Sequence, residues 1–297
     1  MRHAETIRLT GKAVTAAVAA ALLAMASGAG AETLTRISTS IDEPNTDIEI
    51  HYSSATADSD VSHAPVEPGA AGGITVTAKS LTITDDGTSD YLYQTYSGIA
   101  TNSAYPGSDI TLNIAEDLTV TVPRYAIKTN SGSSVTATIG GDLTLTTSDG
   151  NGSTIQATDT GEHGSDDATA GSNVTLKLNG GKAVIQSLAG APSETVISSM
   201  AYGIYVNEGR VEVSGSGENG SEGSISVVSH GIGTAGIYTY GGSVTLQAGS
   251  VKVWGDGEEN DAMETKGGGS IYAFGGSVHI TSPVSYTHLT LPTICSV

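Results

Sequence analysis

The chain contains a repeated segment, and this repeat limits the folds that the sequence can adopt. Residues 203–213 read Gly-Ile-Tyr-Val-Asn-Glu-Gly-Arg-Val-Glu-Val, and similar segments return at 236–246 and 270–280. The three starting positions, 203, 236 and 270, are almost evenly spaced. A repeat of about 33 residues is one supersecondary unit, which stacks on the next copy of itself and buries a shared face. The sequence therefore predicts a solenoid.

Short stretches that alternate apolar and polar residues predict strands with one buried face. They lie at 74–83, 110–120, 135–145, 174–185, 211–228 and 244–253. Weaker copies of the Ile-containing repeat strand lie at 98–101, 125–128 and 153–157. Each coil then has about three strands, which predicts an all-β fold, a right-handed parallel β-helix of about six or seven coils. The alternative is an antiparallel sandwich or barrel with Asp-Gly and Asn-Gly hairpins.

The first residues have the features of an export signal. Basic residues precede the small apolar run 13–26, which ends on Ala29-Gly30-Ala31. About 20 apolar residues are needed to cross a bilayer, and this run has about 14, so a cleaved signal helix fits better than a membrane span. We expect cleavage between Ala31 and Glu32.

The last residues depart from the repeat texture. Residues 284–293, Val-Ser-Tyr-Thr-His-Leu-Thr-Leu-Pro-Thr, resemble the translation of a transposase adaptor used to build short-read sequencing libraries. We therefore expect residues 283–297 to be a non-native tail, so that the natural gene continues past about this point; the alternative is a genuine final strand at 284–291. Cys295, the only cysteine, lies in this tail, so the rest of the chain has no disulfide framework.

These observations divide the chain into four parts. We expect a signal peptide at 1–31, an N-terminal cap or irregular lead-in at 32–71, β-helix repeats at 72–282 and the tail at 283–297. Terminal units of a solenoid are atypical because one of their faces has no neighbouring repeat.

The charge of the chain disfavours several classes of partner. It carries 12 Lys and Arg against 31 Asp and Glu, a formal net charge of −19 at pH 7. A strongly acidic surface repels phosphate groups, so nucleic acid and anionic lipid are not expected as partners. The regularly spaced Val, Ile and Leu residues argue against disorder.

The residues that carry chemistry do not form a recognisable motif. Carboxylates fall mostly in the insertions between strands, where a solvated charge is the ordinary explanation. The histidines lack metal-ligand spacing, and no Gly-x-Ser-x-Gly elbow is present. We therefore predict no catalytic residue, no resident metal and no cofactor. Weak calcium binding by the acidic turns is left open.

The insertions and the tyrosines are the candidate contact elements. Tyr205, Tyr238 and Tyr272 occupy the same position of the repeat, so stacking of coils would align them on one face. Such an alignment either closes the coil or presents a strip to a sugar or protein. The insertions are expected to be loops, a common contact surface in solenoids. They lie at 85–95, 149–171, 190–198, 214–223 and 255–268.

The leader, the cysteine-free acidic coils and strand starts such as Gly-Gly-Ser-Val-Thr at 241–245 resemble the passenger region of Gram-negative autotransporters. The resemblance covers about residues 1–282 and is one of repeat style, so it transfers no active-site residue. It implies a β-helical stalk that is exported, threaded through the outer membrane by a C-terminal β-barrel and displayed at the cell surface. The sequence has no barrel segments, and it lacks the Gly-Asp-Ser-Gly motif of the serine-protease passengers.

Two functions follow as expectations. The first is a surface-displayed or secreted structural or adhesion-type passenger that is not an enzyme and binds an unidentified surface protein or glycan through its inserted loops. The second is a secreted β-helical carbohydrate-active enzyme, a glycoside hydrolase or lyase. A hydrolase would need paired carboxylates on neighbouring coils.

Overall fold

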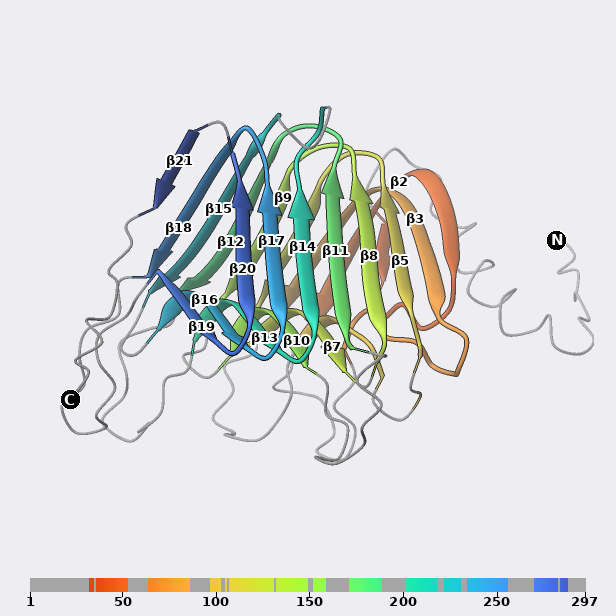
Figure 1. The fold of residues 1–297 in the computed structure, drawn as a ribbon. Helices are drawn as coiled ribbons and strands as arrows, with labels where there is room; N and C mark the ends of the chain where they lie inside the picture. Colours follow the sequence, from red (N-terminus) through yellow and green to blue (C-terminus); the bar gives the residue numbers. More distant parts are fainter. Residues whose placement is uncertain are drawn as a thin grey trace, which may run out of the picture.

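The structure is a computed structural model, and every regular element in the part of the chain that it describes is a β-strand (Figure 1). It describes residues 32–34, 36–52, 64–85, 97–102, 105, 107–130, 132–148, 152–158, 171–188, 201–217, 222–230, 234–255, 270–282 and 284–287. The predicted signal peptide, including Ala31, lies outside these residues. In the part that is described, no helix is long and apolar enough to cross a bilayer.

The strands form three parallel stacks that run along one axis. The first stack contains β3 (Ile74–Asp85), β5 (Ile110–Ile114), β8 (Ser134–Ile139), β11 (Asn173–Leu178), β14 (Arg210–Ser214), β17 (Ser243–Gln247) and β20 (Ser277–Thr281). The second continues from β3 through β6 (Leu118–Val122), β9 (Leu143–Thr147), β12 (Lys182–Leu188), β15 (Ser224–His230), β18 (Ser250–Gly255) and β21 (Val284–Thr287). The third contains β4 (Ser97–Ala100), β7 (Tyr125–Asn130), β10 (Ser153–Thr158), β13 (Tyr202–Asn207), β16 (Ala235–Tyr240) and β19 (Ile271–Phe274).

This arrangement fits a β-solenoid and is the predicted all-β fold with parallel strands. Figure 1 shows the strands of the first stack side by side along the axis, with the third stack along the lower side of the solenoid. Every strand pairing among the described residues is parallel, so the antiparallel sandwich is wrong. The one antiparallel contact in this part of the chain is an isolated bridge between Thr158 and Glu208.

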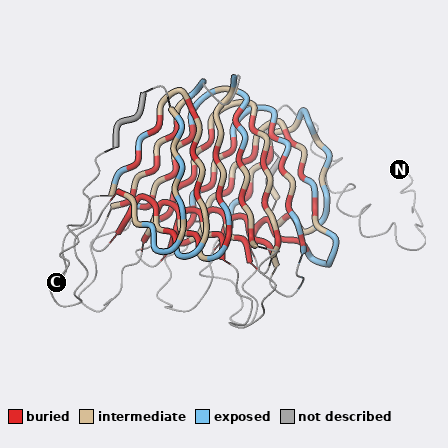
Figure 2. Tube along the Cα trace, viewed as in Figure 1, coloured by how far each residue is buried: buried red, intermediate tan, exposed pale blue. Residues whose placement is uncertain are grey.

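The core is built from inward-facing aliphatic residues that stack on their equivalents in the next coil. In the third stack Ile155 pairs in register with Ile127 on one side and Ile204 on the other, and all three side chains are fully buried. Figure 2 shows buried and less buried residues alternating along the strands. Parallel stacking therefore gives each stack one apolar and one outward face.

A small residue precedes the inward isoleucine in each strand of the third stack. All of these residues are buried, and they are Gly98, Ala126, Thr154, Gly203, Gly236 and Ser270. A Cβ atom on Gly203 would lie 2.6 Å from Val227 Cγ1, a side chain of the second stack. At Gly203 the third stack therefore passes too close to the second for any side chain to fit without a shift.

The segment 32–71, for which we expected a cap or irregular lead-in, contains β1 (Glu32–Leu34) and β2 (Ile41–Tyr52). β1 pairs with β2, and β2 pairs in parallel with β3 through a register shift between Glu43 and Asp47. Ile48 and Ile50 of β2 are buried in the common core.

The predicted non-native tail begins with β21, which pairs in parallel with β18. The register places Ser285 opposite Val251 and Thr287 opposite Val253, so polar residues occupy the register positions of two buried valines. Residues 288–297, including Cys295, lie outside the described part of the chain.

Candidate functional site: the outer face of the third stack

Three tyrosines line the outward face of the third stack, one from each of the strands β13, β16 and β19. Tyr205 pairs in register with Tyr238, and Tyr238 pairs with Tyr272. Their ring centroids are 5.7 Å and 6.2 Å apart, with interplanar angles of 19° and 20°. The repeat predicts this alignment, because residues at one repeat position must follow one another along the axis. Their role as a contact strip stays a prediction.

Three further aromatic side chains extend this row. The Tyr202 ring lies 4.9 Å from Tyr238 and 5.7 Å from Tyr205, centroid to centroid. Tyr240 stacks on Phe274 at 6.5 Å, and these two side chains are 52% and 61% exposed. The tyrosine strip is defined here as Tyr202, Tyr205, Tyr238 and Tyr272. The repeat alone did not place Tyr202, because its position holds Ala235 in the next coil.

The tyrosine rings of the strip stack on one another through their faces. All of these pairs are close to parallel, with interplanar angles between 14° and 25°. A ring that is stacked on both sides offers its edge and its hydroxyl group to a ligand, and its π faces are already occupied. The strip is therefore suited to hydrogen bonding along its outer edge.

Burial keeps the hydroxyl groups of Tyr202 and Tyr205 protonated. It raises the pKa of Tyr202 to about 12, with smaller contributions from Tyr238 and Tyr205. Burial also raises the pKa of Tyr205, again with help from the neighbouring rings. A phenol that stays protonated remains a hydrogen-bond donor at physiological pH.

Toward the N-terminal coils, the column that carries the tyrosines continues with other residue types. Tyr205 pairs in register with Gln156, and Gln156 pairs with Lys128. The Lys128 ammonium lies 4.8 Å from the centre of the Tyr125 ring, in a cation–π contact. Burial, followed by the nearby charge of Arg124, lowers the pKa of Lys128. Sequence reasoning missed Lys128 and Gln156, because they do not repeat.

A glycosidase needs two carboxylates close together. Two carboxylates lie close together on either side of Lys79, a residue of β3. Lys79 Nζ lies 3.2 Å from Asp47 Oδ2 and 3.6 Å from Glu116 Oε2. The hydrogen bond from Ser80, followed by that from Lys79, lowers the pKa of Asp47. A general acid requires a raised pKa, so this exposed trio has the chemistry of a surface ion pair.

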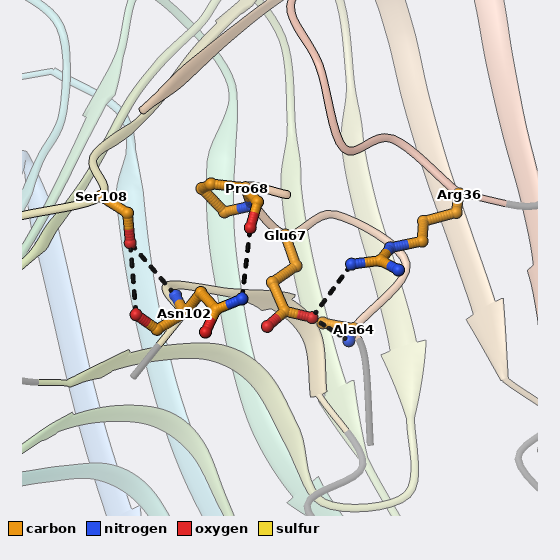
Figure 3. A network of polar contacts seen from close by, with 6 residues as sticks. All are labelled: Arg36, Ala64, Glu67, Pro68, Asn102 and Ser108. Atoms are coloured by element: carbon orange, nitrogen blue, oxygen red, sulfur yellow. Dashed lines mark hydrogen bonds and ion pairs between the residues drawn. The ribbon is translucent and has the colours of Figure 1, made fainter. Parts of the chain in front are cut away.

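A polar network joins the N-terminal coils and is structural in character (Figure 3). Glu67 is buried and accepts a hydrogen bond of 3.0 Å from the Ala64 backbone N–H. Its carboxylate also lies 3.5 Å from the Arg36 guanidinium. The Asn102 side chain donates to the Pro68 carbonyl oxygen at 3.3 Å. These contacts hold turns of successive coils together.

The structure brings no metal-binding group together in the part of the chain that it describes, where no three His, Cys, Asp or Glu side chains cluster. The predicted contact loops lie mostly outside the described residues. Three of the undescribed segments, 86–96, 189–200 and 256–269, connect the second stack to the third, and so they lead into the strands that carry the outer face.

Comparison with known proteins adds no assignment. No known protein family, curated protein or solved structure that was compared with this chain matches it.

Proposed function

We propose that this chain is a non-enzymatic contact protein displayed at the surface of a Gram-negative bacterium, similar in organisation to an autotransporter passenger. The observation that supports this proposal is the tyrosine strip on one outward face of a regular parallel solenoid. In finer detail, we propose a right-handed β-helix of about six or seven coils behind a cleaved signal helix. The partner is a surface glycan or protein.

A contact role explains why large aromatic side chains lie on an outer face. Tyrosine is enriched at interfaces because it joins a large rigid contact area to a polar group at low entropic cost. Tyr240 and Phe274, beside the strip, are more than half exposed. The inserted segments that precede β4, β13 and β19 in the chain are the second predicted contact element.

A carbohydrate-active enzyme is the alternative function. It would need a carboxylic acid with a raised pKa near a second carboxylate. Where Asp47 and Glu116 converge, Lys79 bridges the two carboxylates, and the pKa of Asp47 is lowered. This pair therefore does not supply the general acid that hydrolysis needs.

The experiment that separates these functions uses the purified full chain with immobilised mucin and with pectin. We expect retention on at least one of them, without any rise in reducing ends during incubation. Tyr238→Ser should weaken retention, because Tyr238 is the central ring of the strip. Tyr105→Ser is the matched control, since Tyr105 is 37% exposed and lies on the connection between β4 and β5. Continuous release of reducing ends, or equal retention of both variants, contradicts the proposal.

The proposed export and display are tested separately, by sequencing the genomic locus past codon 283. We expect an open reading frame that continues into coding sequence for an outer-membrane segment. A stop codon shortly after this position would favour a freely secreted protein instead.

A further inference from the structure

Lys128 is a half-buried cation without an acidic partner among the described residues. Its contacts are the Tyr125 ring, 4.8 Å from the ammonium, and the nearby charge of Arg124. Arg36, Lys79 and Arg210, by contrast, each form an ion pair with a carboxylate. An ammonium group that leaves water without a counter-charge costs free energy.

The composition makes the missing carboxylate beside Lys128 informative. The chain has 31 acidic and 12 basic residues, so a carboxylate beside Lys128 would be easy to supply. The next coil instead supplies Gln156 at the paired register position. Burial lowers the pKa of Lys128, and the second cation, Arg124, lowers it further. A desolvated group with a perturbed pKa on an outer face is a candidate binding group.

Gln156 adds an unsatisfied polar atom at the same place. Its Oε1 atom is buried and has no hydrogen-bond partner in the described part of the chain. Buried polar atoms nearly always have a partner, and one without a partner calls for an explanation such as a ligand. Gln156 lies between Lys128 and Tyr205 in the column. An ammonium donor, an amide acceptor and a phenol hydroxyl therefore follow one another along one face.

We propose that Lys128, Gln156 and Tyr205 form a subsite for a saccharide that carries a single carboxylate. The carboxylate accepts hydrogen bonds from the Lys128 ammonium, a sugar hydroxyl donates to Gln156 Oε1, and the Tyr205 hydroxyl donates to a sugar oxygen. This inference rests on the proposed contact function of the third stack, and it names the class of ligand for that surface.

The chemistry of the site favours a sugar with one acidic group. The site offers side chains on a sheet face and no free strand edge, so a peptide cannot add to it by main-chain pairing. A sugar ring bears hydroxyl groups next to its carboxylate and can satisfy a donor and an acceptor on neighbouring coils. The described site offers one ammonium group, that of Lys128, and so it can pair with one carboxylate.

The test compares acidic sugars with neutral counterparts by calorimetry on the full chain. The probes are sialyllactose against lactose, and galacturonate against galactose. Lys128→Met should weaken binding of an acidic probe by about tenfold to a hundredfold, the range for hydrogen bonds to charged groups, and leave the neutral probes unchanged. Lys177→Met is the matched control, because Lys177 is exposed on the first stack and the change in charge is the same.

Gln156→Glu is the complementary variant, since it places an internal carboxylate beside Lys128. It should abolish binding of the acidic probes, while its thermal melting curve shows that the solenoid remains folded. Lys128→Arg should retain most of the binding, which separates loss of charge from loss of folding.

Three results overturn the inference. They are equal binding of acidic and neutral probes, an equal loss in Lys177→Met, and acidic binding that survives Gln156→Glu. If the contact function itself fails, the result is different. Mucin and pectin then retain the Tyr238→Ser variant to the same extent as the unmodified chain.

Discussion

Tyr238 is the residue whose loss should cost the tyrosine strip most. It contacts three rings, Tyr202 at 4.9 Å, Tyr205 at 5.7 Å and Tyr272 at 6.2 Å. An aromatic pair at such distances contributes about 0.5–1.5 kcal/mol beyond the area it buries, so three pairs give about 1.5–4.5 kcal/mol. Tyr238→Ser should therefore lower the free energy of unfolding by about 3 kcal/mol, with the lost buried area adding to this value.

Tyr240→Ser is the control within the same strand. Tyr240 has one ring partner, Phe274 at 6.5 Å, and is 52% exposed, so its replacement should cost about 0.5–1.5 kcal/mol. Urea unfolding followed by circular dichroism measures both variants. The slope with urea must be compared as well, because repeat proteins can unfold in parts. An equal loss in the two variants would show that the strip does not stabilise the solenoid through ring stacking.

Three further predictions concern the backbone and the tyrosine hydroxyls. Glu208 has a φ of 58°, in the left-handed region that Gly241 adopts one coil later with a φ of 75°. Glu208→Gly should stabilise the chain by about 0.5 kcal/mol in urea unfolding, whereas Gly241→Ala should destabilise it by about 1–2 kcal/mol; the opposite order would contradict this assignment of strain. Gly203→Ala would bring a Cβ atom within 2.6 Å of Val227 Cγ1 and should cost about 1–3 kcal/mol, and an unchanged melting temperature would refute the close approach of the two stacks. In alkaline titration followed by phenolate absorbance, one tyrosine should ionise with a pKa of about 12, and Tyr202→Phe should remove that step. Because the folded pKa of Tyr202 is higher than its ordinary value of 10.0, folded chains hold more protons in this window, and stability should fall as the pH rises from 10.0 to about 12.

The sequence was sufficient to predict the strands and the tyrosine column, because both depend on periodicity. Alternation at residues 74–83 and 244–253 marks one buried face, and β3, β17 and β18 form there. Like residues at one repeat position must align when coils stack, as Tyr238 and Tyr272 do. These features are local or recur once per coil, so the order of residues determines them.

The N-terminal half was harder to align from the sequence, because its coils differ in length. Val135 pairs with Ile110 of the preceding coil and with Val174 of the following one, and the second step along the chain is much longer than the first. In the same way, Gln156 pairs with both Lys128 and Tyr205, although Tyr205 is much further from it in sequence. Their proximity results from insertions of unequal length, which spacing alone does not reveal.

The positions that break the repeat carry most of the functional information about the third stack. Stacking of like residues is what a repeat produces automatically, so a row of tyrosines has a structural explanation that is sufficient by itself. That explanation does not cover Lys128 and Gln156, because neither has an equivalent on the adjacent coils. Among the described residues, Lys128 has a ring partner and no carboxylate, and Gln156 Oε1 has no hydrogen-bond partner. Unsatisfied polar groups cost stability, and a solenoid could replace them with another threonine or tyrosine. A structural role and a binding role of Lys128 and Gln156 predict different results. Only a binding role makes the recognition of an acidic sugar depend on Lys128.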